Sequence, residues 1–409
     1  MSPMTSVLTV LGSLISVSVS DAFVVPMMAP GGGASAFAKN NVGGTPTMMA
    51  TFRVSASSSK EFEPLKGPYA PLRFNNKNRA WVPQRPRPRR NRKSEAVRSM
   101  VRENVVRPAN FIYPLFIHEE DFEVEIKPMP GCLRHSLPHM LKEVEEAWQF
   151  GVRTFVVFPK VPDNLKTNHG HESFNPSGIV PRAVSMIKER FPDSIVCTDV
   201  ALDPYSDQGH DGVVMDGKIL NDETIMQLTK QAVCQARAGS DVVAPSDMMD
   251  GRVGAIRDAL DSEGFTDVSI LAYTAKYASA FYGPFRDALD SHPGFGDKKT
   301  YQQDPANGRE ALLEAALDAA EGADMLMVKP GMPYLDVIRR LKESTPLPIS
   351  AYHVSGEYAM MKAAVERGWL DERAAVLEAM TCFKRAGADV ILTYYAKDAA
   401  RWLCEDGLV

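Results

Sequence analysis

The sequence predicts an α/β protein whose main domain, residues 111–409, is a (β/α)8 TIM barrel preceded by an extended N-terminal arm. From residue 111 onward, short apolar runs rich in β-branched residues alternate with longer amphipathic segments. This alternation is typical of parallel strands joined by helices. Eight such apolar runs are present, which is the number that closes a TIM barrel. An open, doubly wound sheet is the alternative fold, but no GxGxxG motif follows the first strand.

The expected strands are separated by segments with helical periodicity, and two of these, 308–321 and 372–386, show the period most clearly. The strands are expected at 111–118, 154–160, 195–202, 241–246, 269–276, 324–330, 348–355 and 389–396. Three helices end in a glycine just before the next strand, at Gly239, Gly322 and Gly387. Glycine readily adopts the left-handed conformation that closes a helix, so these positions predict helix ends.

The composition indicates a soluble globular protein, with 44% apolar and 24% charged residues among 409. A net charge of −5 gives no general reason to expect nucleic acid or a stable membrane association. The cysteines form no CxxC pair and no zinc-binding pattern with histidine, which favours free thiols in a reducing compartment. They are Cys132, Cys197, Cys234, Cys382 and Cys404.

The N-terminal segment has the features of a two-part targeting sequence. Residues 1–22 contain an apolar run too short to span a bilayer and similar to the core of a signal peptide. Residues 23–66 resemble a transit peptide, because the tract is rich in serine and has no acidic residue from Phe23 to Lys60. This combination predicts delivery to the plastid (chloroplast) stroma. The alternative is an N-terminal tail without a targeting function.

The next segment, 67–110, is rich in proline and arginine and is expected to form the N-terminal arm. Its basic run, 85–93, also permits a second hypothesis, an RNA- or DNA-binding protein. No RNP-like aromatic pattern or helix-turn-helix pattern accompanies the run. We therefore favour an arm that is either solvated or embraces a neighbouring subunit.

In a barrel of this kind, the active-site residues lie at the carboxyl ends of the strands. Polar residues end most of the later strands and include two lysines on adjacent strands. They are Asp199 and Asp203, Ser246 and Asp247, Lys276, Lys329, Tyr352, His353 and Ser355, and Tyr394 and Tyr395. Because neighbouring strands end side by side, we expect Lys276 and Lys329 to lie close together.

Two lysines at one barrel mouth suggest Schiff-base chemistry. A lysine attacks a carbonyl only when its amine is neutral, so its pKa must fall from about 10.4 towards 7–8. That shift corresponds to roughly 4 kcal/mol, which burial and a second nearby ammonium can supply. Each lysine could instead mark a strand end and extend into water. A class I aldolase-type lyase is the nearest enzymatic rival, but one lysine would suffice for its chemistry.

Several segments closely resemble motifs of the porphobilinogen synthase (5-aminolevulinate dehydratase) family. The likeness runs in order from about Arg85 to the C-terminus and does not cover residues 1–80. The segments are 244–252 (APSDMMDGR), 272–287 (AYTAKYASAFYGPFRD), 327–336 (MVKPGMPYLD), 352–357 (YHVSGE) and 393–395 (TYY). The resemblance implies a lyase that condenses two 5-aminolevulinate molecules to porphobilinogen with loss of two waters, in haem and chlorophyll biosynthesis. It also implies a homo-octamer.

The same resemblance implies catalytic roles. Lys329 would form a Schiff base with the first substrate molecule, in the P site, and Lys276 with the second, in the A site. Asp199 and Ser246 match polar residues that line the P-site pocket, and Asp199 is a candidate for proton transfer. Tyr352, at the end of the seventh strand, is a further candidate for substrate binding.

Other matched residues would hold the two substrate carboxylates. Ser355 and Tyr394 match the residues that bind the P-site carboxylate. Arg286 and Lys298 match the basic pair that binds the A-site carboxylate. Both basic residues lie on the segment 281–303, which resembles the mobile lid of the family.

The metal requirement is expected to differ from that of zinc-dependent members, which have three cysteines where this chain has Ala201, Asp203 and Asp211. Carboxylates suit Mg²⁺ rather than zinc, so the chain resembles the aspartate-rich, Mg²⁺-responsive type. Asp203 and Asp211 could hold Mg²⁺ in the active site or serve only in hydrogen bonding. Glu310 matches the glutamate that binds an allosteric Mg²⁺ in Mg²⁺-responsive relatives.

Overall fold

The computed structural model describes residues 73–74, 80–81 and 87–407. The chain divides into two units, Met1–Arg87 and Pro88–Val409. The described part of the first unit is one antiparallel strand pair, β1 (Arg73–Phe74) with β2 (Ala80–Trp81). The predicted signal-like segment 1–22 and transit-like tract 23–66 lie outside the described residues.

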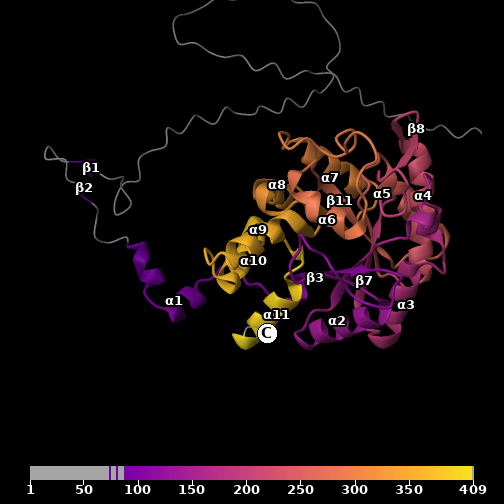
Figure 1. The fold of residues 1–409 in the computed structure, drawn as a ribbon. Coiled ribbons are helices and arrows are strands. Elements are labelled where there is room, and N and C mark those ends of the chain that lie inside the picture. The colour runs from indigo at the N-terminus through magenta and orange to yellow at the C-terminus, as the bar shows by residue number, and fades with distance from the viewer. Residues whose placement is uncertain (1–72, 75–79, 82–86, 408–409) are drawn as a thin grey trace, which may run out of the picture. The chain divides into compact units, whose positions relative to one another are not determined.

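The second unit is a closed parallel barrel, which confirms the predicted fold and excludes the open sheet (Figure 1). Its strands pair in chain order, and the last returns to the first through Ile391 opposite Phe111. They are β3 (Phe111–Ile117), β6 (Thr154–Pro159), β7 (Ile195–Val200), β10 (Val242–Pro245), β11 (Ser269–Lys276), β12 (Met325–Lys329), β13 (Ile349–His353) and β14 (Val390–Thr393). Most of their residues are buried, because side chains fill the barrel on one face and helices cover the other.

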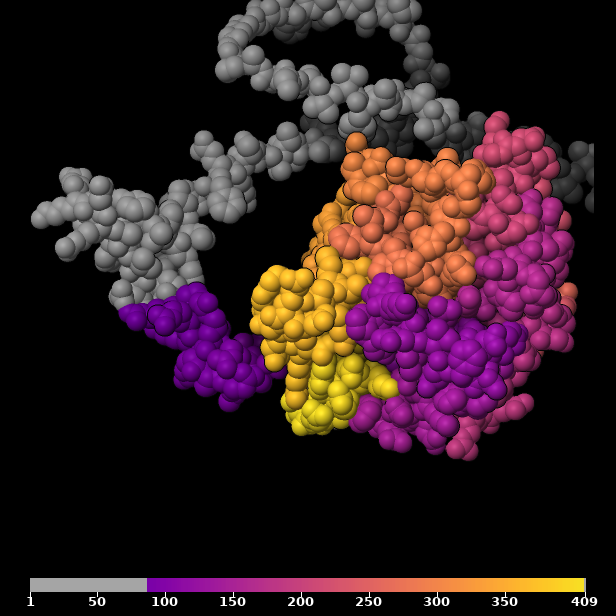
Figure 2. Space-filling view, in the orientation of Figure 1, coloured from indigo at the N-terminus to yellow at the C-terminus, as the bar shows by residue number. Residues whose placement is uncertain are grey.

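Helices surround this barrel. They are α2 (Leu137–Gln149), α3 (Ile179–Arg190), α4 (Asn221–Arg237), α5 (Arg252–Ser262), α7 (Glu310–Ala320), α8 (Leu335–Ser344), α9 (Ser355–Glu366), α10 (Glu372–Ala386) and α11 (Ala396–Glu405). The surface of α11 adjoins that of the early barrel segments, as expected where the barrel closes (Figure 2). The three predicted helix-ending glycines all have positive φ, at 104° for Gly239 and Gly322 and 120° for Gly387.

The second unit also contains shorter elements. The strands among them are β4 (Val124–Glu125), β5 (Leu133–His135), β8 (Val213–Met215) and β9 (Lys218–Leu220). The helices among them are η1 (Pro88–Arg92), α1 (Glu95–Met100), η2 (Pro108–Asn110), η3 (Asp163–Leu165), η4 (His171–Phe174), η5 (Ala280–Tyr282), α6 (Gly283–Leu289) and η6 (Met332–Tyr334). In the expected arm, η1 and α1 have no buried residue. Within the described residues, none of the helices has both the length and the apolar character needed to cross a bilayer.

At the N-terminal end of the barrel, three aspartates tie neighbouring strands together. Each stands just before one strand and accepts a hydrogen bond from the first or second backbone N–H of the strand before it, at 2.7–2.9 Å. The pairs are Asp241 with Val196, Asp324 with Ile270, and Asp389 with Ile349. These carboxylates satisfy backbone donors that the strand pairing leaves unpaired.

Candidate active site

The two lysines lie side by side at the mouth of the barrel. Lys276 is the last residue of β11 and Lys329 the last residue of β12, and the two are register partners. Both are buried, with exposed fractions of 5% and 6%. The fold therefore brings together the two amines that the sequence singled out.

Their surroundings differ sharply. The Nζ of Lys276 donates to the backbone carbonyl of Ser246 and lies 3.4 Å from the carboxylate of Asp211. The Lys329 side chain makes no hydrogen bond or ion pair with any described residue, although its backbone carbonyl accepts from the Tyr277 N–H and the Tyr282 hydroxyl. Its Nζ instead lies 4.6–5.3 Å from the centres of four aromatic rings, those of Tyr273, Tyr282, Phe285 and Tyr352. A positive charge on Lys329 is therefore less well compensated by neighbouring groups than one on Lys276.

The pKa of Lys329 follows from that environment. The pKa falls from 10.5 to about 7, mainly because the amine is buried and also because the ammonium of Lys276 is nearby. The carboxylate of Asp199 acts in the opposite direction. An amine with a pKa near 7 is substantially neutral at physiological pH, as nucleophilic attack on a ketone requires.

Asp199, on β7, is the titratable partner of Lys329. Burial raises the pKa of its carboxyl to about 7, against the attraction of Lys329 and a hydrogen bond from Ser246. Two buried amides of α4 hold its backbone, because Gln235 and Gln231 donate to the Asp199 carbonyl at 2.9 and 3.3 Å. A group with this pKa can both accept and release protons near neutrality.

The residues expected to hold the P-site carboxylate also gather at the mouth. The hydroxyls of Tyr352 and Tyr394 are 2.7 Å apart and both side chains are buried. Ser355 accepts a hydrogen bond from the backbone N–H of Phe285 at 3.0 Å and donates to the Phe281 carbonyl at 3.3 Å. Ser355 thus contacts the segment 281–303, the expected lid, directly.

The two basic lid residues occupy different environments. Arg286 lies half-buried on α6 and makes no side-chain hydrogen bond with a described residue. Lys298 is buried and forms ion pairs with Asp211 at 3.0 Å and Asp203 at 3.2 Å. Burial opposes the charge of Lys298, but the two carboxylates outweigh it and raise its pKa. Burial likewise opposes ionisation of Asp211, yet the ammonium groups of Lys276 and Lys298 hold its pKa below the usual range.

This arrangement bears on the predicted active-site metal. A cation held by Asp203 and Asp211 would have to displace the Lys298 ammonium that already lies between their oxygens. Among the described residues, no cluster of three or more histidine, cysteine or acidic side chains could hold a metal ion directly. The two aspartates therefore fit an ion-pair role better than a Mg²⁺ site.

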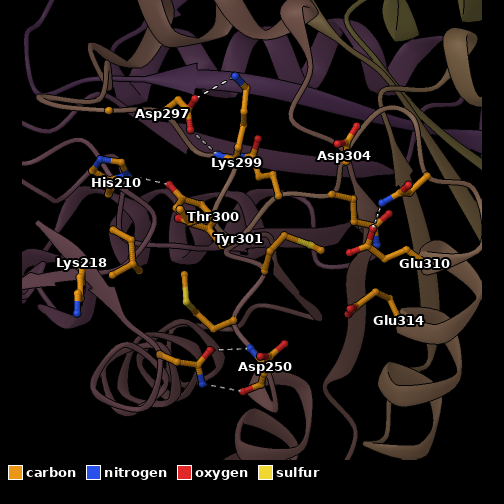
Figure 3. A pocket seen from close by; sticks show the side chains of 18 of the residues that line it. His210, Lys218, Asp250, Asp297, Lys299, Thr300, Tyr301, Asp304, Glu310 and Glu314 are labelled. Carbon is orange, nitrogen blue, oxygen red and sulfur yellow. Dashed lines mark hydrogen bonds and ion pairs between the residues drawn. The ribbon is translucent and has the colours of Figure 1, made fainter.

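Glu310 lies away from the lysines, at the start of α7, where Asn307 donates to it at 3.0 Å. It lines a cavity of about 900 Å³. Asp250, Asp304 and Glu314 share this cavity, with His210 and Tyr301 on the opposite side (Figure 3). The cavity is therefore rich in carboxylates, although these do not converge on a single point.

Sequence reasoning missed part of the site. The aromatic rings around Lys329 include Tyr273, Tyr282 and Phe285, all of which lie inside the quoted lysine motif 272–287. The glutamines behind Asp199 carry no comparable signal, because polar residues on an amphipathic helix are ordinarily exposed.

Comparison with known proteins agrees with this geometry. Residues 85–402 match the family model for delta-aminolevulinic acid dehydratase. The chloroplastic delta-aminolevulinic acid dehydratase of Physcomitrium patens is 63% identical over 322 residues, covering 78% of this chain and 74% of that protein. The Chlamydomonas reinhardtii chloroplastic enzyme is 62% identical, covering 78% and 84%. Both names confirm the predicted plastid location.

A solved structure agrees as well. The delta-aminolevulinic acid dehydratase (porphobilinogen synthase) of Toxoplasma gondii, in complex with the reaction product porphobilinogen, superposes with a TM-score of 0.79. It is 60% identical, and the match covers 83% of this chain and 97% of that one. The chain therefore belongs to the delta-aminolevulinic acid dehydratase (porphobilinogen synthase) family, whose members are metal-binding lyases of tetrapyrrole biosynthesis.

Proposed function

We propose that this chain condenses two 5-aminolevulinate molecules to porphobilinogen through Schiff bases at Lys329 and Lys276. The observation that carries the proposal is the pairing of two buried amines across adjacent strand ends, one of them with a pKa of about 7. A single-lysine lyase has no use for the second amine. Nucleic-acid binding through 85–93 would leave the buried pair unexplained.

The reaction balances with these two groups. Each amine attacks the ketone of one substrate and releases one water as the imine forms. The bonds that close the pyrrole ring then return both lysines to the free amine, so the net products are porphobilinogen and two waters. Asp199 is placed to carry protons during these steps, because its pKa of about 7 matches that of Lys329.

The polar groups around the lysines supply binding. We assign the first substrate carboxylate to Ser355, Tyr394 and Tyr352, and the second to Arg286 and Lys298. Ser246 would line the first pocket. Because the Ser355 hydroxyl already contacts the lid backbone, binding of a carboxylate there would couple substrate binding to lid closure, which excludes water from the imines.

Borohydride trapping tests the covalent step. With 5-aminolevulinate bound, reduction should fix adducts at Lys329 and Lys276, identified by peptide mass spectrometry. Lys362→Ala serves as a control, since that lysine is paired with Glu372 and lies outside the proposed chemistry. A protein that makes porphobilinogen normally yet gives no adduct at Lys329 would contradict the mechanism.

We further propose that the metal of this chain is Mg²⁺, bound near Glu310 largely through water. The carboxylates that line the cavity in Figure 3 support an oxygen-liganded ion, and their separation suits outer-sphere binding. A phenanthroline-type zinc chelator should leave activity intact, Mg²⁺ should raise it, and Glu310→Ala should reduce that response. Stoichiometric zinc that alone restores activity would overturn this assignment.

Assembly and targeting complete the proposal. We propose that residues 67–110 form an arm that embraces a neighbouring barrel within a homo-octamer, and that residues 1–22 and 23–66 are removed on import into the plastid. The absence of buried residues in η1 and α1 supports a segment that packs on another subunit. Deleting 80–95 should give smaller assemblies, measured by light scattering, with lower activity in an enzyme assay. A fully active monomer would refute the proposed role of the arm.

A further inference from the structure

Glu357 is a fully buried carboxylate with no positive partner. It lies in the first turn of α9, has an exposed fraction of 0%, and makes no ion pair with any described residue. Burying a charge without a compensating partner strongly destabilises the folded state. An acid in this position therefore needs a specific reason.

The partners of Glu357 are backbone N–H groups from two different loops. One oxygen accepts from Met332 at 2.6 Å, three residues after Lys329. The other accepts from Val354 at 2.6 Å, immediately before Ser355. The carboxylate thus joins the loop that follows β12 to the loop that follows β13.

This geometry favours the ionised carboxylate. Both partners are donors, so each oxygen must act as an acceptor. Burial raises the pKa of Glu357 to about 7, and the backbone hydrogen bonds oppose that shift. An amide of the same shape could satisfy only one N–H, because its NH₂ group would face the other donor.

The same turn also forms the surface on which the lid rests. At Gly356, an added Cβ would lie 2.5 Å from the Phe281 carbonyl oxygen, and Ser355 bonds to the backbone of Phe281 and Phe285. The position of this turn therefore sets where the Ser355 hydroxyl and the lid backbone stand relative to Lys329.

We propose that Glu357 is a positioning residue for the Lys329 half of the active site, holding the Lys329 strand end and the Ser355 hydroxyl at a fixed separation. The inference rests on the proposed function, in which Lys329 forms an imine and Ser355 binds the carboxylate of the same substrate. Lys276 has separate supports, the Ser246 carbonyl and Asp211, and does not depend on Glu357.

The test is Glu357→Gln in the full-length assembled enzyme. The probe is levulinate, which has the ketone and carboxylate of the substrate but lacks its amine. After borohydride reduction at saturating levulinate, adducts at Lys329 and Lys276 are quantified separately by peptide mass spectrometry. Displacement of about 1 Å can cost about a hundredfold in rate, so the Lys329 adduct should form at least about tenfold more slowly. The Lys276 adduct should change less than about twofold by the same reasoning.

Asp389→Asn is the matched control, because Asp389 accepts a backbone N–H at the opposite end of the same strand, β13. It should alter neither adduct selectively. If the unmodified enzyme gives no Lys329 adduct, the proposed function itself fails. If the enzyme and Glu357→Gln give the Lys329 adduct equally fast, only the role of Glu357 fails.

A purely structural role is distinguished in the same experiment. Equal loss of both adducts in Glu357→Gln would overturn the proposal, because a general disturbance does not choose between the lysines. If Glu357→Gln does not fold, Glu357→Asp replaces it under the same criteria, since it keeps the charge but reaches only one of the two N–H groups. Failure of both variants to fold would assign Glu357 to folding and also overturn the proposal.

Discussion

The two ends of the barrel use charge in opposite ways. At the N-terminal end, Asp241 and Asp389 each accept a strand N–H and also pair with a lysine, at 3.0 Å to Lys188 and 2.7 Å to Lys342. At the C-terminal end, Lys329 is buried with no acceptor among the described residues and a pKa of about 7. Charge at the first end stabilises the fold, whereas charge at the second is held at a cost in stability that makes the amine reactive.

Replacing Lys329 with methionine tests this contrast with the largest expected effect. Turnover should fall by about ten-thousandfold or more, because the proposed nucleophile is lost. Stability should rise by about 1–4 kcal/mol, because an apolar side chain of similar size replaces an uncompensated amine. Activity assays and urea unfolding measure the two effects.

The pH dependence of that stability gain has a definite sign. The folded pKa of Lys329 is below its unfolded value of 10.5, so the native enzyme gains stability as pH rises from about 7 towards 10.5. The advantage of Lys329→Met should therefore be largest below pH 7 and shrink in alkali. A variant that is less stable than the native enzyme at every pH would show that the buried Lys329 does not lower the stability of the native enzyme.

The second prediction concerns the pH dependence of imine formation. Single-turnover trapping at Lys329 should accelerate about tenfold per pH unit below 7 and level off above it, as the amine loses its proton. Asp199→Asn should move the midpoint to lower pH, because the Asp199 charge favours the ammonium. Since the charge of each group shifts the pKa of the other, the midpoint belongs to the pair. A midpoint near 10 would mean that the groups around Lys329 do not shift its pKa.

The third prediction concerns Lys298. Its charge lies at the reactive, C-terminal end of the barrel and is balanced by Asp203 and Asp211. Lys298→Ala should raise the concentration of 5-aminolevulinate needed for half-maximal rate by about tenfold or more, the value of a charged hydrogen bond. Lys299→Ala is the control, because its side chain is 74% exposed and pairs only with Asp297 among the described residues. Equal substrate dependence in the two variants would show that Lys298 serves only Asp203 and Asp211.

The sequence predicts the barrel strands much better than it predicts the contacts made by loops. Hydrophobic periodicity located all the barrel strands to within a few residues, and β11 and α10 matched their expected bounds, because burial on a regular lattice leaves a regular pattern. Lys276 and Lys329 were placed together because parallel strands end at one edge. The ion pairs of Lys298 and the backbone contacts of Glu357 depend on loop conformations, which carry no periodic signal.

The smallest expected effect is at the N-terminal end. Asp389→Ala removes the acceptor for the Ile349 N–H and the partner of Lys342. The site is half-exposed, so water replaces part of what is lost, and we expect a decrease of about 1–2 kcal/mol in the free energy of unfolding. The substrate dependence and the Lys329 adduct should stay unchanged, because β13 remains held at its other end by Glu357.

Asp193→Ala provides the comparison for that last measurement, since Asp193 is exposed and makes no hydrogen bond among the described residues. Its unfolding free energy should change by less than about 0.5 kcal/mol. If Asp389→Ala instead slowed imine formation at constant stability, the two ends of the barrel would be mechanically coupled through β13. The division between a stabilising end and a reactive end would then no longer hold.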